Sequence, residues 1–161
     1  MENYTSILSF LDYLEIDSDS NDYKNVISIH SKYVEGQAFC ISREQLNSDI
    51  SINAISLFTI YATYFTPQSD IVIFNYNFSQ LKLHYDSLLP IIELIDPEGI
   101  MMKHQNKRNI DLNNGSRIRL EVTTVTSLCG MSANTAFLMT DKTDDNFYEV
   151  FDHRFKIIFS I

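Results

Sequence analysis

The stretch FCISREQLNSDISINAISLF, residues 39–58, decides which kind of fold the chain forms. Within it, AFCIS at 38–42 is a short apolar run bounded by Gly36 and by a polar loop, which indicates a buried strand. The loop SREQLNSD at 42–49 then leads into apolar residues at helical spacing, which predict a helix from about 49 to 65. A strand, a loop and a helix in this order are the outline of a phosphate-binding loop.

The loop lacks the residue types that bind phosphate. A working phosphate loop has the form G-x-x-x-x-G-K-[ST], in which glycines let backbone N–H groups surround the phosphates and the lysine reaches the terminal phosphate. The chain has 4 glycines, none of them in the 42–49 loop and none followed by lysine. Without glycine the loop loses the required geometry, and without lysine it loses the required charge.

The rest of the chain alternates helical and strand patterns. Further helices are expected at about 4–15, 23–33 and 79–95, the last with Ser79 as a possible N-cap, and further strands at 70–76, 135–140 and 155–161. Asn113-Asn114-Gly115 stands between two alternating runs and predicts a β-hairpin. Strands that alternate with helices favour an α/β fold in which a mainly parallel sheet is covered on both faces.

Length and composition indicate one soluble domain. The chain has 161 residues, of which 45% are hydrophobic and 20% charged, and no apolar run reaches the ~20 residues that cross a bilayer. The N-terminus has no basic region typical of a secretory signal, so a cytoplasmic location is expected. Cys40 and Cys129 are interpreted as small buried hydrophobes, and the four histidines show no ligand spacing, so no metal site is predicted.

The net charge of −9 is unevenly distributed. Residues 1–22 carry six acidic side chains and no Lys or Arg, which disfavours direct binding to nucleic acid. The one basic cluster contains Lys103, Lys107, Arg108, Arg117 and Arg119. It is interpreted as a solvated loop and strand face, with nucleic-acid contact as the less favoured alternative.

Two groups of apolar residues have alternative interpretations. Leu8, Leu11 and Leu14 of the acidic N-terminal helix either contact a partner or cover the domain's own core. Abundant aromatic residues are expected to fill the layers between sheet and helices rather than stack on bases; they are Tyr61, Tyr64, Phe65, Phe74, Tyr76 and Phe78.

The order of these pieces resembles the ATPase domain of phage large terminase subunits, especially the T4-like ones, the motors that pump DNA into proheads. The matching pieces are Asp22-Tyr23, FCISREQLNSD, DIVIFNY, IDLNNGSRI, SLCGMSANTAFLMTDK and KIIFSI. The resemblance covers 21–161, with 1–20 as an acidic N-terminal helix and linker. It implies a three-layer P-loop NTPase-like (RecA-like) domain with a mainly parallel central sheet and one hairpin, truncated at the C-terminus before the family's nuclease domain.

The resemblance also places the family's catalytic positions on this chain. Leu46 stands where the family has glycine, Asn47 where it has the phosphate-binding lysine, and Lys142 where it has the catalytic glutamate. Lysine is a poor base for water attack at neutral pH. These three substitutions predict that the chain does not hydrolyse ATP.

Four residues match the family's nucleotide site in type and remain as a possible binding remnant. Tyr23 lies where the family reads adenine, Arg43 matches a loop arginine, Ser48 keeps a hydroxyl at the Mg²⁺ position and Asp141 matches the metal-binding aspartate. The expected cofactor is none, and ATP with Mg²⁺ is expected only if these residues retain binding.

The resemblance and the substituted loop together predict a non-catalytic, terminase-like phage protein that acts through protein–protein contacts, as a regulatory or structural factor linked to DNA packaging. The expected partner is a packaging or capsid component or a host protein, and the expected location is the host cytoplasm or the virion, away from membranes. The alternatives are one piece of a split terminase, a residual nucleotide-binding ATPase domain, and a decaying reading frame without a role.

Overall fold

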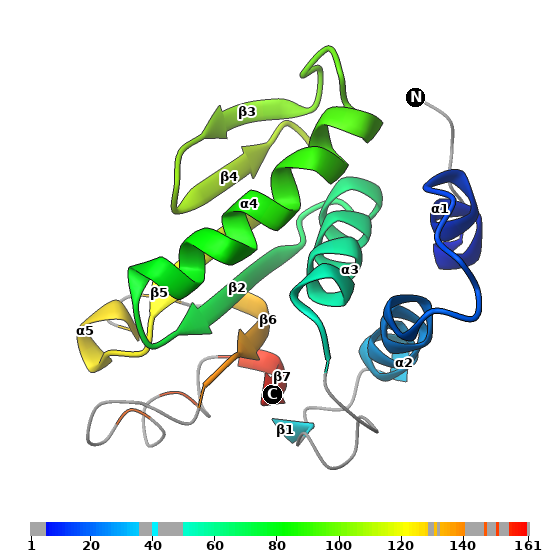
Figure 1. The fold of residues 1–161 in the computed structure, drawn as a ribbon. Coiled ribbons are helices and arrows are strands. Elements are labelled where there is room, and N and C mark those ends of the chain that lie inside the picture. The colour runs from blue at the N-terminus through cyan, green and yellow to red at the C-terminus, as the bar shows by residue number, and fades with distance from the viewer. Residues whose placement is uncertain are drawn as a thin grey trace.

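The computed structural model describes residues 6–35, 40–41, 50–128, 131, 133–140, 147, 151 and 155–160 (Figure 1). Its helices are α1 (Ile7–Tyr13), α2 (Asn21–Glu35), α3 (Ile52–Phe65), α4 (Phe78–Ile95) and α5 (Val125–Leu128). Its strands are β1 (Cys40–Ile41), β2 (Asp70–Asn75), β3 (Met102–Gln105), β4 (Asn109–Leu112), β5 (Arg117–Val122), β6 (Ala133–Leu138) and β7 (Phe155–Ser160). No helix among these residues is both long and apolar enough to span a membrane.

All of these strands belong to one mixed sheet in the order β1-β7-β6-β2-β5-β4-β3. Neighbours from β1 to β5 run parallel, whereas β4 and β3 are added antiparallel at one edge. The predicted α/β fold and mainly parallel sheet are therefore confirmed. The strand β3 was not predicted, because its residues are mostly exposed and polar and give no apolar alternation.

Both faces of the sheet are covered by apolar side chains. Along β2, Ile71 and Ile73 join the core beneath α1 to α4, while Val72 and Phe74 join a second core on the opposite face. This alternation follows from the two-residue period of a strand. The second core includes residues from α5, β6 and the start of β7, so the expectation of two covered faces is confirmed.

The N-terminal helix α1 packs into the main core. The Phe10 ring lies 5.6 Å from the Tyr61 ring and 5.7 Å from the Phe65 ring, both on α3. Leu11 is fully buried, whereas Leu8 remains 49% exposed. Of the two interpretations for this helix, the structure therefore shows it covering the domain's own core, with Leu8 outside that contact.

Two helix starts differ from the sequence prediction. The helix α3 begins at Ile52 rather than near 49, and its N-cap is Ser51. The N-cap of α4 is Asn77 rather than Ser79, because the Asn77 side chain accepts a hydrogen bond of 2.9 Å from the Gln80 N–H. Ser79 lies inside the first helical turn. Asn and Ser are similarly good N-caps, so local sequence alone does not choose between them.

The predicted hairpin turn is confirmed, and it also anchors α3. Gly115 adopts φ of 84°, a left-handed conformation that glycine reaches without strain. The Asn114 amide donates a 2.8 Å hydrogen bond to the Thr63 carbonyl, and the Ser116 hydroxyl donates one of 3.0 Å to the Thr66 carbonyl. The turn therefore connects the β4–β5 hairpin to the last turn of α3.

The aromatic residues divide into buried and exposed groups. Tyr64 and Phe74 are buried, and Tyr61 and Phe65 pack partly buried against the main core, as predicted. Tyr76 and Phe78 are instead 43% and 51% exposed. The prediction that they fill the core was wrong, because both follow the end of β2 and lie beyond the layer where sheet and helices meet.

Candidate functional site

The carboxyl ends of the parallel strands define the candidate site, because ligands bind at this edge in open α/β sheets. Ile41 of β1 pairs with Phe159 of β7, and Phe159 pairs in turn with Phe137 of β6. The ends of β1 and β6 are therefore two strand spacings apart, or roughly 10 Å. The loops that follow these two strands thus leave the sheet from the same edge.

Most of the predicted site residues belong to those two loops. They are Arg43, Leu46, Asn47 and Ser48 after β1, and Asp141 and Lys142 after β6; all lie outside the described residues. The described strands position the start of each loop but not these side chains. The roles assigned to these residues therefore stay predictions.

The N-terminus of α3, which follows the 42–49 loop, carries a hydrogen-bonded chain that sequence reasoning missed. The Ser51 hydroxyl oxygen accepts a 3.0 Å hydrogen bond from the Ala54 N–H, and the same hydroxyl donates to the Asp22 carboxylate. Serine directly before an apolar helical pattern was the available signal for this cap. An acidic side chain thus lies at the positive end of the α3 dipole, where it stabilises the helix.

Tyr23, the predicted adenine-side residue, lies on the first turn of α2. It is partly buried against the main core, and its backbone N–H donates a 3.1 Å hydrogen bond to the Ser20 hydroxyl. Because the preceding Asp22 contacts Ser51, the start of α2 lies beside the start of α3. The structure therefore brings the Tyr23 segment close to the exit of the 42–49 loop.

Two further polar side chains at this edge hold backbone turns. The Asn75 side chain is buried and its oxygen accepts a 2.8 Å hydrogen bond from the Tyr76 N–H. The Thr124 hydroxyl accepts one of 3.2 Å from the Ser127 N–H at the start of α5. Within the described ranges, no group of three or more His, Cys, Asp or Glu side chains is arranged to hold a metal ion.

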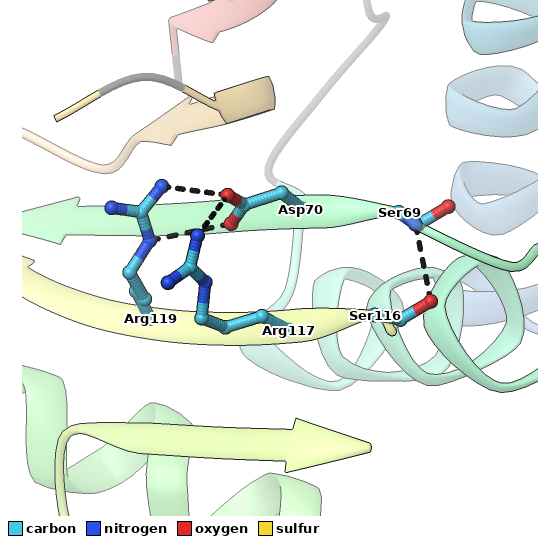
Figure 2. Close-up of polar contacts among 5 residues, drawn as sticks. All are labelled: Ser69, Asp70, Ser116, Arg117 and Arg119. Carbon is cyan, nitrogen blue, oxygen red and sulfur yellow. Dashed lines mark hydrogen bonds and ion pairs between the residues drawn. The ribbon is translucent and has the colours of Figure 1, made fainter. Parts of the chain in front are cut away.

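A charged cluster lies at the opposite edge of the sheet, where β2 begins (Figure 2). Asp70 forms ion pairs of 2.7 Å with Arg117 and 3.0 Å with Arg119, both on the neighbouring strand β5. Next to it, the Ser69 N–H donates a 3.1 Å hydrogen bond to the Ser116 hydroxyl. Two of the cations that the sequence placed in a basic cluster are thus paired in the structure, and their contacts join β2 to β5.

Burial perturbs two titratable groups in the core between α3 and α4. Desolvation lowers the pKa of His84 to about 4, because the charged imidazolium is disfavoured in an apolar environment. Burial raises the pKa of the Tyr64 hydroxyl, and the nearby charge of Asp96 raises it further. Both groups lie in the main core rather than at the carboxyl edge, and we assign them no catalytic role.

Comparisons with known proteins identify a shared fold. No protein-family description and no curated protein matches the sequence. Among solved structures, this chain is similar to the large terminase ATPase domain of Thermus phage P74-26, in a single-residue mutant form. The two superpose with a TM-score of 0.61 at 11% sequence identity, over 94% of this chain and 68% of that one. The same domain without the mutation gives a TM-score of 0.57 at 13% identity, over 93% and 67%.

This likeness confirms the predicted resemblance at the level of fold. The similarity extends over 94% of this chain. At identities of 11% and 13%, it describes the architecture and leaves the chemistry of the site to the residues of this chain.

Proposed function

We propose that this chain is a non-catalytic, terminase-like phage protein that acts through protein–protein contacts, as a regulatory or structural factor linked to DNA packaging. The observation that carries the proposal is the sequence of the 42–49 loop, in which Leu46 and Asn47 replace the glycine and lysine of a phosphate loop. The fold around this loop resembles that of a phage terminase ATPase domain. The proposed location is the host cytoplasm or the virion.

The electrostatics at the start of α3 support the loss of nucleotide chemistry. A helix N-terminus binds phosphate through free N–H groups and a positive dipole. Here the Ala54 N–H is already bonded to Ser51, and the Asp22 carboxylate contacts the same hydroxyl. A phosphate group approaching this end of the helix meets a carboxylate of like charge instead of a lysine.

The strand that would hold the metal and the catalytic base supports the same proposal. Asp141-Lys142 follows β6, and lysine at this second position supplies a positive charge where hydrolysis requires a carboxylate. The required residue types are thus missing from two separate loops, one after β1 and one after β6. Their absence removes both phosphate binding and the activation of the attacking water.

Nucleotide titration tests the non-catalytic part. The fluorescence of an N-methylanthraniloyl ATP analogue is followed with excess Mg²⁺ as the protein is added, in parallel with Asp141→Ala. We expect no saturable signal in either protein. Saturable micromolar binding that is lost in Asp141→Ala refutes the proposal and establishes the alternative, a residual nucleotide-binding domain that uses Arg43, Ser48 and Asp141.

Affinity capture tests the protein-contact part. The tagged chain is expressed in infected host cells, cross-linked and purified, and the co-purifying proteins are identified by mass spectrometry. We expect a packaging or capsid component or a host protein at stoichiometric level. A nuclease-domain polypeptide in a fixed ratio instead establishes a split terminase, and a solitary monomer throughout infection refutes partner binding.

A further inference from the structure

A pocket of about 410 Å³ lies between the first half of α4 and the β3–β4 hairpin. Figure 1 shows the hairpin running beside α4 on the side away from α1 and α2. The pocket volume falls within the ~300–1,000 Å³ range of ligand sites. Leu81 and Leu120 are almost completely buried and form its apolar floor, whereas the Phe78 ring at its rim is half exposed.

Two side-chain contacts connect α4 to the hairpin across the pocket. The guanidinium carbon of Arg108 lies 4.2 Å from the centre of the Phe78 ring, in a cation–π arrangement. Two turns further along α4, the Tyr85 hydroxyl accepts a 2.9 Å hydrogen bond from the Gln105 side chain. Because the two contacts join the same pair of elements at separate points, they hold the pocket walls at a defined separation.

The basic turn of the hairpin is held in place by its own hydrogen bonds. The Asn106 side-chain oxygen accepts from the N–H groups of Arg108 and Asn109, at 2.8 and 2.9 Å. The Arg108 carbonyl accepts a 2.8 Å hydrogen bond from the Leu120 N–H, which attaches the turn to β5. A turn ordered before binding costs less conformational entropy when a ligand binds.

The rim of the pocket is positive in a chain that is negative as a whole. Lys82, Lys107 and Arg108 line it together with a single acid, Asp86, which is paired with Lys82. The lining residues carry three cations and one carboxylate, a formal charge of +2, against a net charge of −9 for the chain; Glu121 of β5 does not line the pocket, but its charge interacts with Arg108 and offsets part of this excess. The pocket therefore favours a ligand that combines an apolar body with negative charge.

The pocket suits an acidic peptide better than nucleic acid. Nucleic-acid binding requires a longer basic stripe and flat stacking surfaces. Here Arg117 and Arg119 are paired with Asp70, and the floor is aliphatic. A protein segment needs one buried apolar anchor with charges at the rim, which is the usual arrangement of an interface hot spot.

We propose that this pocket is the docking site for an acidic segment of the protein partner. One bulky apolar side chain of the segment enters between Phe78 and the Leu81–Leu120 floor, and carboxylates beside it meet Lys107 and Arg108. The inference rests on the proposed function, because it names the surface through which the protein contact is made.

Peptide selection tests this docking site. A display library of random 12-residue peptides is selected on the purified full chain, and the dissociation constants of synthesised, fluorescein-labelled winners are measured by anisotropy. We expect winners with Asp or Glu next to Phe, Leu, Ile or Trp. Lys107→Glu and Phe78→Ala should each weaken their binding roughly tenfold, through lost charge attraction and a lost anchor contact.

Matched variants outside the pocket control for charge and exposure. Lys103→Glu makes the same charge change on the same hairpin, and Leu94→Ala removes a similarly exposed apolar side chain from the same helix. Both should change binding less than about twofold, since neither lines the pocket. Circular dichroism of each variant verifies that it is folded.

Three outcomes overturn the docking site. The first is that selection yields no peptides with an acidic residue next to an apolar one. The second is that the selected peptides bind the pocket variants and the control variants equally. The third is that a 20-nucleotide oligo-dT binds the chain and Lys107→Glu abolishes that binding, which assigns the pocket to nucleic acid. Partner capture with the same variants separates the two proposals. If a partner is captured equally by wild type and pocket variants, the proposed function stands and only this site is refuted.

Discussion

Replacing His84 should reduce the acid sensitivity of the fold. His84 lies on the core-facing stripe of α4, between Leu81 and Leu88, and is only 1% exposed. Its Nδ1 has no hydrogen-bond partner among the described residues. Burial lowers the pKa of the imidazole from 6.5 to about 4, so the native state holds the ring neutral.

The sign and size of the effect follow from proton linkage. Between pH 6.5 and 4 the unfolded state binds the proton more readily than the native state, so the free energy of unfolding falls as the pH falls. A fall in the pKa of His84 from 6.5 to about 4 corresponds to a total of roughly 3 kcal/mol, of which roughly 2 kcal/mol is lost by pH 5. Above about pH 7 this contribution to stability is fully present.

Urea unfolding of wild type and His84→Leu at about pH 7.5 and about pH 5 measures the effect. The chain contains no tryptophan, so far-ultraviolet circular dichroism is the suitable signal. We expect the loss of stability between the two pH values to be roughly 2 kcal/mol smaller in the variant, since leucine does not titrate. Other titrating groups contribute equally to both proteins and cancel in the comparison.

His104→Leu is the control, because His104 lies exposed on β3. This variant should keep the pH dependence of the wild type. If His84→Leu also keeps it, the imidazole is not a buried neutral group and the argument from desolvation is refuted.

Three further changes test an ion pair, a helix cap and a turn glycine, all by urea unfolding at neutral pH. Asp70→Asn should lower the free energy of unfolding by about 2 kcal/mol, because it removes the carboxylate charge that pairs with the mostly buried Arg119. Arg117→Ala should lower it by less than about 1 kcal/mol, since the Arg117 side chain is about half exposed; equal effects contradict this ranking. Ser51→Ala should lower the free energy of unfolding by about 1 kcal/mol through loss of the α3 cap, and Ser51→Thr should lower it much less. Equal losses in the two variants would count against a capping role. Gly115→Ala should lower the free energy of unfolding by about 1 kcal/mol through backbone strain alone, since an added Cβ meets only the Gln68 side chain at 3.5 Å. If Gly115→Ala lowers it no more than Gly115→Asn does, the argument from strain is refuted.

Elements with a strong local signal were predictable from the sequence. The run DIVIFNY became β2, and the Asn113-Asn114-Gly115 turn became the β4–β5 hairpin, because apolar runs and turn residues act over a few neighbouring positions. Exposed β3 and the four-residue α5 gave no comparable pattern. Their formation depends on neighbouring strands and on the core, which lie far away in sequence.

The candidate site divides in the same way. That the 42–49 loop lacks glycine and lysine is a property of the sequence itself, and so is the lysine at position 142. The Ser51–Asp22 contact depends on how α2 packs beside α3, over a separation of 29 residues, so no local pattern predicts it. No local pattern predicts that Phe78 is exposed beside Arg108 either, and these two side chains form the rim of the pocket.

The sequence by itself determined the alternation of helices and strands, the hairpin turn and the absence of glycine and lysine from the 42–49 loop, because each depends on residue type and short-range spacing. Only the tertiary structure decided the strand order, which separates β1 from β2 by β7 and β6, and the burial of His84 in the core. Strand order and burial are set by long-range pairing and by which surfaces leave water together. Those are properties of the packed chain as a whole, and no short segment carries them.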